Sequence, residues 1–215
     1  RLGVNAGNSI ASGGNYNVVV GDEAGTAIST GDGNTFVGYE AGKTVATASE
    51  NTAFGYQALK LNAAGDGNTA IGVKAMDANV VGDRNVAVGS DALGTMNPAT
   101  NADTYNTAVG YAAGTAITTS KYNTLVGGLA GDALTTSAGY NVAFGYLALS
   151  ADTLGQESCA FGSQALATQN FTTTTLTYNT AVGTSAGRLV TTGVQNTIIG
   201  GLSGDALTSG GSNVA

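Results

Sequence analysis

The stretch NTAVGYAAG, residues 106–114, decides how the whole sequence is understood, because close copies of it occur along the entire chain. The copies include NTFVGYEAG at 34–42, NTAFGYQAL at 51–59, NVAFGYLAL at 141–149 and NTAVGTSAG at 179–187. A regular internal repeat of this kind indicates that one small structural unit is used many times.

The copies return at an almost constant interval. Their first residues are Asn17, Asn34, Asn51, Asn68, Asn85, Asn106, Asn123, Asn141, Ser158, Asn179, Asn196 and Asn213. The interval is 17 residues, except that it is 21 after Asn85 and after Ser158, and 18 after Asn123. Because the register is never lost, the sequence predicts a single array of about a dozen units over residues 1–215, as a fragment of a longer fibre.

A unit of this length is too short for a helical repeat, which needs roughly 33 residues or more. Glycine, which accounts for 34 of the 215 residues, also disfavours helix. The first five places of the unit are Asn, Thr or Val, an apolar residue, then Val, Ile or Phe, then Gly, which is typical of a short strand ending in a turn. We therefore predict an all-β fold, a parallel β-solenoid or β-roll in which each 17-residue coil stacks on the previous one.

Individual positions of the repeat unit predict individual contacts between coils. We number these positions as places, with place one at the first residue of each copy. Asn at place one would form a ladder of side-chain amides that is interrupted only at Ser158. Gly at place five, present in every complete copy, indicates a positive φ or a close approach of two backbones. Wherever place nine is Gly, place twelve is Ile, Val or Leu, which indicates that both places fill the same hole in the core.

Both faces of the predicted strand are apolar. We assign place four to the inside of the coil, so place three, its neighbour, must face outward. An outward apolar stripe implies a partner surface, and identical stripes are most simply buried by copies of the chain around a common axis. We therefore expect a homotrimer. Its candidate interface consists of Val19, Phe36, Ala53, Ala70, Ala87, Ala108, Leu125, Ala143, Ala160, Ala181 and Ile198.

The motifs NTAVGYAAG, NTAFGYQAL, NTAIGVKAM and NVAFGYLAL resemble the Asn-Thr-Ala-x-Gly repeats of bacteriophage tail-fibre proteins. They are also similar to the head repeats of trimeric autotransporter adhesins, although the adhesin unit is shorter and has Ser where this chain has Thr. The resemblance covers nearly the whole chain and implies a left-handed, trimeric β-roll. It implies a structural segment of a phage tail fibre on the virion that contributes to host attachment. A bacterial adhesin head on the cell surface is the alternative.

Composition argues against several other classes of function. The net charge of −7, from 7 basic and 14 acidic residues, disfavours binding to nucleic acid and to anionic membranes. No apolar run is long enough to be inserted in a membrane. The chain has no histidine for a Ser-His or Cys-His pair, and the GDGN turns at 31–34 and 65–68 supply too few oxygens for calcium. We expect no enzymatic activity, no catalytic residue, no cofactor and no metal site. Cys159 is interpreted as a small buried hydrophobe.

The two 21-residue copies each carry four extra residues, near 94–103 and 167–176. Loops on a rigid scaffold often carry binding sites, and the alternative is that these are tolerated insertions. The candidate contacts with a cell-surface glycan or protein receptor are Asn97, Thr100, Asn101, Asn170, Phe171 and Thr173. The tyrosines that flank the repeat core also have two interpretations: they bind sugar, or they pack between chains.

An ice-binding solenoid is a further alternative, because stacked threonines can order water on a flat face. The pairs Thr118–Thr119, Thr135–Thr136 and Thr191–Thr192 are separated by coils that lack them, which interrupts such an array. The sequence therefore favours a fibre over an ice-binding surface.

Overall fold

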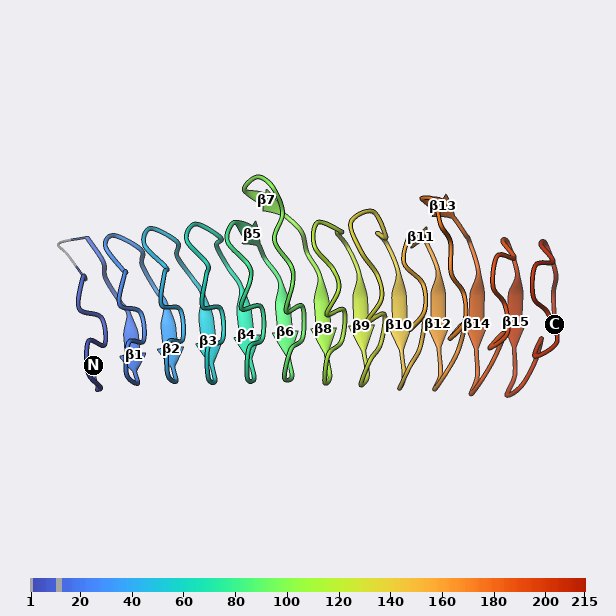
Figure 1. The fold of residues 1–215 in the computed structure, drawn as a ribbon, viewed down its shortest axis with the longest axis horizontal. Helices are drawn as coiled ribbons and strands as arrows, with labels where there is room; N and C mark the ends of the chain where they lie inside the picture. Colours follow the sequence, from blue (N-terminus) through green and yellow to red (C-terminus); the bar gives the residue numbers. More distant parts are fainter. Residues whose placement is uncertain (1, 11–12) are drawn as a thin grey trace. The chain divides into compact units, whose positions relative to one another are not determined.

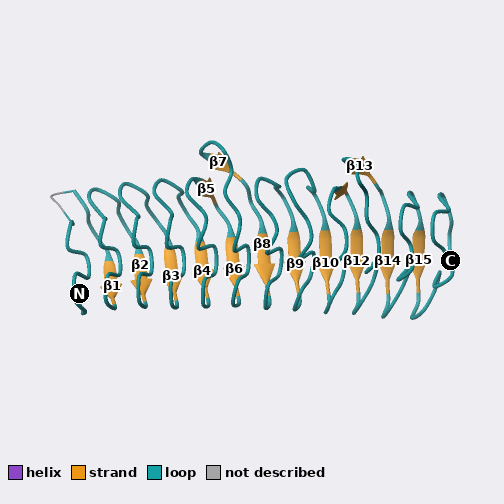
Figure 2. Ribbon diagram, in the orientation of Figure 1, coloured by secondary structure: helices purple, strands orange, loops and turns teal. Residues whose placement is uncertain are grey.

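The computed structural model describes residues 2–10 and 13–215 and consists of short strands joined by turns (Figure 1). Over these residues there is no α-helix (Figure 2), and a search of them finds no helix that could cross a membrane. The chain divides into two compact units, Arg1–Tyr105 and Asn106–Ala215, which we call unit 1 and unit 2 and describe separately.

In unit 1, successive coils each contribute one three-residue strand to a parallel sheet. These strands are β1 (Val18–Val20), β2 (Thr35–Val37), β3 (Thr52–Phe54), β4 (Thr69–Ile71) and β6 (Val86–Val88). Equivalent residues of the repeat are paired, for example Phe36 with Ala53. A second, two-stranded parallel pair joins β5 (Gly82–Asp83) to β7 (Ala102–Asp103), so the first inserted segment adds a strand at the corner of its coil.

Unit 2 repeats this arrangement. Its main parallel sheet contains β8 (Thr107–Val109), β9 (Thr124–Val126), β10 (Val142–Phe144), β12 (Cys159–Phe161), β14 (Thr180–Val182) and β15 (Thr197–Ile199). The second inserted segment also forms a parallel pair, between β11 (Gly155–Gln156) and β13 (Thr175–Leu176). The prediction of an all-β parallel β-solenoid with a 17-residue coil is confirmed in both units.

The prediction of which strand face points inward is wrong. The middle residue of each strand, at place three, lies inside the coil, with an exposed fraction of 3% for Val19 and 0% for the other ten positions. Place four points outward instead, and 57% of Phe54 and 63% of Ile199 are exposed. The residues that we expected at a trimer interface are therefore buried within their own chain and cannot contact a second one: Val19, Phe36, Ala53, Ala70, Ala87, Ala108, Leu125, Ala143, Ala160, Ala181 and Ile198.

The reason lies in how the narrow interior is filled. Coils with Leu or Met at place nine all have Ala at place three, whereas Val19, Phe36, Leu125 and Ile198 occur with Gly at place nine. A Cβ atom on Gly42 would lie 2.5 Å from the Phe36 ring, and one on Gly131 would lie 2.8 Å from Leu125 and from Leu134. Places three, nine and twelve therefore share one volume, as close packing requires. The predicted exchange between places nine and twelve is confirmed, with place three as a third participant.

The predicted asparagine ladder is also present. In unit 1, the backbone N–H of Asn68 donates to Oδ1 of Asn51 at 2.9 Å, and its Nδ2 donates to the Gly82 carbonyl at 2.8 Å. These amides are fully buried, so each bond satisfies a group that would otherwise be costly to bury.

At Ser158, the one break in the ladder, the second inserted segment supplies the missing amide. Gln169 donates from Nε2 to Oγ of Ser158 at 2.8 Å and accepts from Nδ2 of Asn179 at 2.8 Å. The hydroxyl groups of Ser158 and Thr177 lie 2.6 Å apart. Residues of the insertion thus take over the contacts that an asparagine makes elsewhere.

The glycines at place five mark a close approach of backbones, as predicted. Gly55 has φ +140°, and a Cβ atom there would lie 2.5 Å from the carbonyl oxygen of Gly72 in the next coil. Only glycine combines this backbone conformation with this separation.

Candidate functional site

The first candidate site is the outer face of the main sheet in each unit. We define the outward sheet face of each unit as places two and four of its three-residue strands, since alternate residues of a strand share a face. In unit 1 these are Val18, Val20, Thr35, Val37, Thr52, Phe54, Thr69, Ile71, Val86 and Val88. In unit 2 these are Thr107, Val109, Thr124, Val126, Val142, Phe144, Cys159, Phe161, Thr180, Val182, Thr197 and Ile199. Neither face contains a charged residue.

Large apolar side chains are exposed on this face. In unit 2 the rings of Phe144 and Phe161 stack at a centroid distance of 4.7 Å, and 45% and 46% of these residues are exposed. In unit 1, Phe54 and Ile71 are similarly exposed. Contiguous apolar surface of this kind marks an interaction site in soluble proteins.

Cys159 belongs to this outward face and is half-buried, so its interpretation as a buried core residue is wrong. It is the middle member of a column in which Val142 and Thr180 are its paired neighbours. Its thiol therefore reports directly on whether the face is covered.

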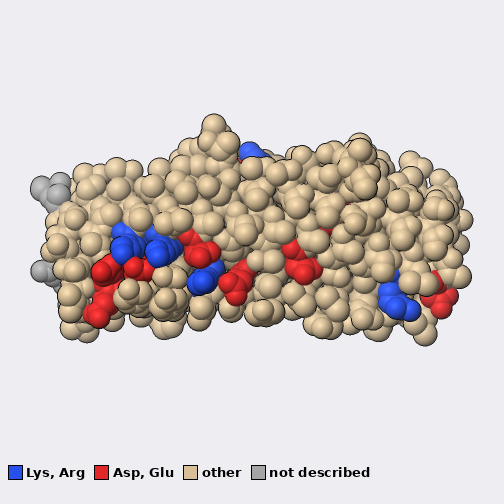
Figure 3. Space-filling view, viewed as in Figure 1, with Lys and Arg blue, Asp and Glu red and all other residues tan. Residues whose placement is uncertain are grey.

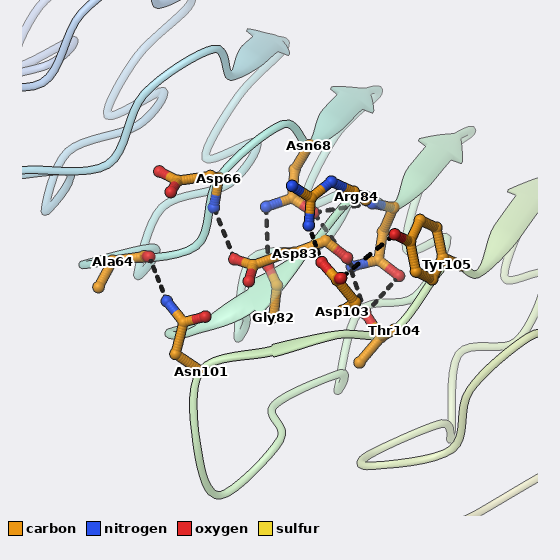
Figure 4. A network of polar contacts seen from close by, with 11 residues as sticks. Ala64, Asp66, Asn68, Gly82, Asp83, Arg84, Asn101, Asp103, Thr104 and Tyr105 are labelled. Atoms are coloured by element: carbon orange, nitrogen blue, oxygen red, sulfur yellow. Dashed lines mark hydrogen bonds and ion pairs between the residues drawn. The ribbon is translucent and has the colours of Figure 1, made fainter.

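The inserted segments place most of the candidate receptor contacts on the surface of their own units. In unit 1, Asn97, Thr100 and Asn101 are exposed, and Nδ2 of Asn101 donates to the Ala64 carbonyl at 3.0 Å (Figure 4). In unit 2, Asn170 and Thr173 are exposed.

Phe171 does not join them, because it is only 6% exposed. Its backbone carbonyl accepts a hydrogen bond of 2.9 Å from the Thr153 hydroxyl, which holds the segment against the preceding coil. The expectation that Phe171 touches a receptor is therefore wrong, and its side chain instead anchors the insertion.

A series of polar residues closes the corners of unit 1. Each of them lies two residues before one of the asparagines at place one. We call this set the corner ladder: Asn15, Asp32, Ser49, Asp66 and Asp83. The carboxylate of Asp66 accepts a hydrogen bond from the Ser49 backbone N–H at 2.7 Å. That of Asp83 accepts from the Asp66 N–H at 2.8 Å (Figure 4). The aspartates of the GDGN turns are thus engaged by backbone donors. Among the described residues, no group of three or more His, Cys, Asp or Glu could hold a metal ion.

In unit 2 the equivalent places are Lys121, Gly139, Gln156, Thr177, Val194 and Gly211, so no carboxylate closes these corners. Between Lys121, Gly139 and Gln156 the surface is hollowed, with a cavity volume of about 230 Å³ that is open to solvent. Sequence reasoning missed this hollow. The signals for it were the 18-residue interval after Asn123 and the glycine at a corner where unit 1 has acidic or hydroxyl side chains.

Unit 1 also carries a cluster of opposite charges on its surface, and Figure 3 shows basic and acidic groups side by side toward the N-terminal end. The Lys43 ammonium bonds to Glu40 at 2.7 Å and also pairs with Glu23, while Lys60 lies 2.8 Å from Glu40. These cations, Lys43 first, lower the pKa of Glu40 from 4.5 to about 2. The cluster ties together three successive coils.

An acidic residue of unit 2 has the opposite environment. Asp152 is buried inside its coil, where Gln169 donates to its Oδ2 at 2.6 Å and the Gly155 N–H donates to its Oδ1 at 3.0 Å. Desolvation nevertheless raises the pKa of Asp152 above its ordinary value, and the hydrogen bonds offset only part of that effect.

Comparison with known proteins identifies no relative of this chain. No family model, no curated protein and no solved structure matches it. The function is therefore inferred from the geometry of the two units and from the pattern of the repeat.

Proposed function

We propose that this chain is a structural segment of a surface fibre, a phage tail fibre on the virion, in which three copies associate through their outward sheet faces. The observation that carries the proposal is the outward sheet face itself, which holds no charge in either unit. It exposes large apolar side chains, among them Phe54 and Ile71 in unit 1 and Phe144, Phe161 and Ile199 in unit 2. The resemblance of the repeat to tail-fibre motifs supports the same assignment.

The distribution of charge favours a second copy of the chain as the partner. Two copies with a net charge of −7 repel each other unless the charges lie away from the contact. Places two and four hold no charge, while the acidic residues Glu23, Glu40 and Asp66 lie elsewhere in their coils. Identical stripes of apolar surface are most simply buried around a closed symmetry axis, and three copies suit a narrow coil.

The coil itself is suited to a structural role. Its interior is filled by small and aliphatic side chains, and its corners are held by asparagine amides that run from one coil to the next. Stability in such an array comes from neighbouring units, so the array can be extended without a new core. A bacterial surface adhesin would use the same construction and is the alternative location.

The threonines at place two favour one other candidate, an ice-binding face. Thr35, Thr52 and Thr69 occupy this place in three successive coils of unit 1. However, the bulky side chains of Phe54 and Ile71 lie beside them on the same face, which makes it uneven. A thermal-hysteresis assay separates the two candidates, and the fibre proposal predicts no hysteresis.

The test of self-association uses charge placed on and off the outward sheet face. The double variant Phe144→Asp and Phe161→Asp should sediment as a monomer, because like charges then meet in the interface. The control Thr173→Asp adds a carboxylate at an exposed loop position of the same unit and should leave the assembly intact. Identical sedimentation of all three proteins would contradict the proposal.

A further inference from the structure

The hollow in unit 2 exists because one corner has lost its side chain. Gly139 stands at the corner-ladder place, and its coil is one residue longer than its neighbours. A Cβ atom on Gly139 would lie 3.1 Å from the Lys121 carbonyl and 4.0 Å from Oγ of Ser120, and no other atom approaches it within that range. The space that an aspartate fills in unit 1 is therefore left open.

The hollow is lined by hydroxyl and amide side chains, two tyrosines and a glycine, with Lys121 as the one charged residue of the lining. Lys121 takes part in none of the ion pairs found among the described residues, so its ammonium is available to a ligand. Thr119, Thr136 and Ser137 contribute hydroxyl groups, and no carboxylate lines the cavity. The amide of Gln156 is fixed across one side, where its Nε2 donates to the Ser137 carbonyl.

Two tyrosines form another wall. The rings of Tyr122 and Tyr140 stack at a centroid distance of 4.9 Å with an interplanar angle of 22°. Because the two rings support each other, they present a rigid aromatic edge to the hollow.

We propose that this hollow binds one saccharide residue that carries a carboxylate. Its volume is below the roughly 300–1,000 Å³ of sites for drug-sized ligands, which suits a single ring. Lys121 would pair with the carboxylate, and the surrounding hydroxyl and amide groups would bond to ring hydroxyls. The lining residues do not belong to the outward sheet face, so the site is independent of self-association.

Saturation-transfer NMR on the whole chain tests this proposal with two probes, methyl glucuronide and methyl glucoside. We expect transfer to the glucuronide, and about tenfold weaker binding of the neutral glucoside, since a hydrogen bond to a charged group is worth about that factor. Lys121→Met should remove the preference for the glucuronide.

Gly139→Asp should abolish binding, because it restores the corner residue of unit 1 and puts a negative charge in the cavity. Thr184→Asp, with the same charge at an exposed turn position of unit 2 outside the hollow, should bind as the original chain does. Circular dichroism establishes that each variant is folded.

Three results would overturn the assignment: no transfer to either glycoside, unchanged glucuronide binding in Lys121→Met, or displacement of the glucuronide by inorganic phosphate of equal affinity. The last result would indicate a simple anion site. None of these results depends on whether the chains associate, so the fibre proposal is tested separately.

Discussion

Units 1 and 2 use the same repeat, and they differ most at their corners. In unit 1, Asp66 and Asp83 join each corner to the backbone of the preceding coil. In unit 2, the same places carry Lys121, Gly139 and Gln156, and a hollow opens between them. The interior of the coil is alike in both, with Ala at place eight in every complete copy except for Ser203, and a buried residue at place three. The core therefore determines the fold, while the corners are free to change charge and shape.

The largest effect should come from the backbone contact that both units share. Gly55→Ala in unit 1 and Gly145→Ala in unit 2 each place a Cβ atom 2.5 Å from the next coil, at φ +140°. We expect each change to lower the free energy of unfolding by roughly 3 kcal/mol or more, as measured by chemical denaturation.

Gly33→Ala is the matched control, because this glycine has φ +66° with nothing within 4 Å of its added Cβ. It should cost only about 1 kcal/mol, for the left-handed conformation alone. Equal losses at Gly33 and Gly55 would mean that the close approach of coils is unimportant.

The next largest loss of stability should come from removing a buried side-chain amide, either one of the asparagine ladder or that of Gln169 at the break in the ladder. Asn68→Ala removes a buried amide of unit 1, and Gln169→Ala removes the amide that bridges Ser158 and Asn179 in unit 2. Each change leaves buried partners without a hydrogen bond, so each should cost about 2 kcal/mol. If Gln169→Ala proved neutral in denaturation experiments, the insertion would have no part in repairing the ladder.

A smaller loss of stability should distinguish the corners of unit 1 from those of unit 2. Asp66→Ala removes the acceptor for the Ser49 N–H and should lower stability by about 1 kcal/mol. Val194→Ala, at the equivalent place of unit 2, has no such bond to lose and should change stability less. Equal effects would contradict the distinction between the two kinds of corner.

The smallest effect on stability should come from the ion pairs of Glu40, and it depends on pH. The pKa of Glu40 is lowered to about 2 from 4.5, so its ion pairs stabilise unit 1 above pH 4.5 and this contribution is lost as the pH falls toward 2. Glu40→Gln should therefore lower stability by about 0.5 kcal/mol at neutral pH and have no effect near pH 2. Thermal unfolding of both proteins at the two pH values measures this difference, and a pH-independent difference would exclude the ion pairs as its cause.

Much of this architecture could be predicted from the sequence. The 17-residue interval, the β-branched residues before Gly55 and its equivalents, and the asparagine column determine the coil and its stacking. The inward face could not be chosen by composition, because Ala53 and Phe54 are both apolar and either could be buried. The exchange between Phe36 and Gly42 was the available signal, since a large residue at place three occurs only with Gly at place nine.

The inserted segments were harder to predict. Phe171 looked like a surface contact because it lies in a polar, threonine-rich stretch, yet its ring is buried. Its environment depends on how the insertion folds against Thr153 of the preceding coil, which no local pattern encodes. The hollow beside Gly139 likewise requires the corners of neighbouring coils to be compared in space.

The molar mass of the unmodified chain in dilute buffer tests most directly whether the outward sheet faces associate. Light scattering should give three times the 21.0 kDa of one chain. The Cys159 thiol should react more slowly in this assembly than in the variant carrying Phe144→Asp and Phe161→Asp. A mass of 21.0 kDa, with a fully reactive thiol, would contradict the account.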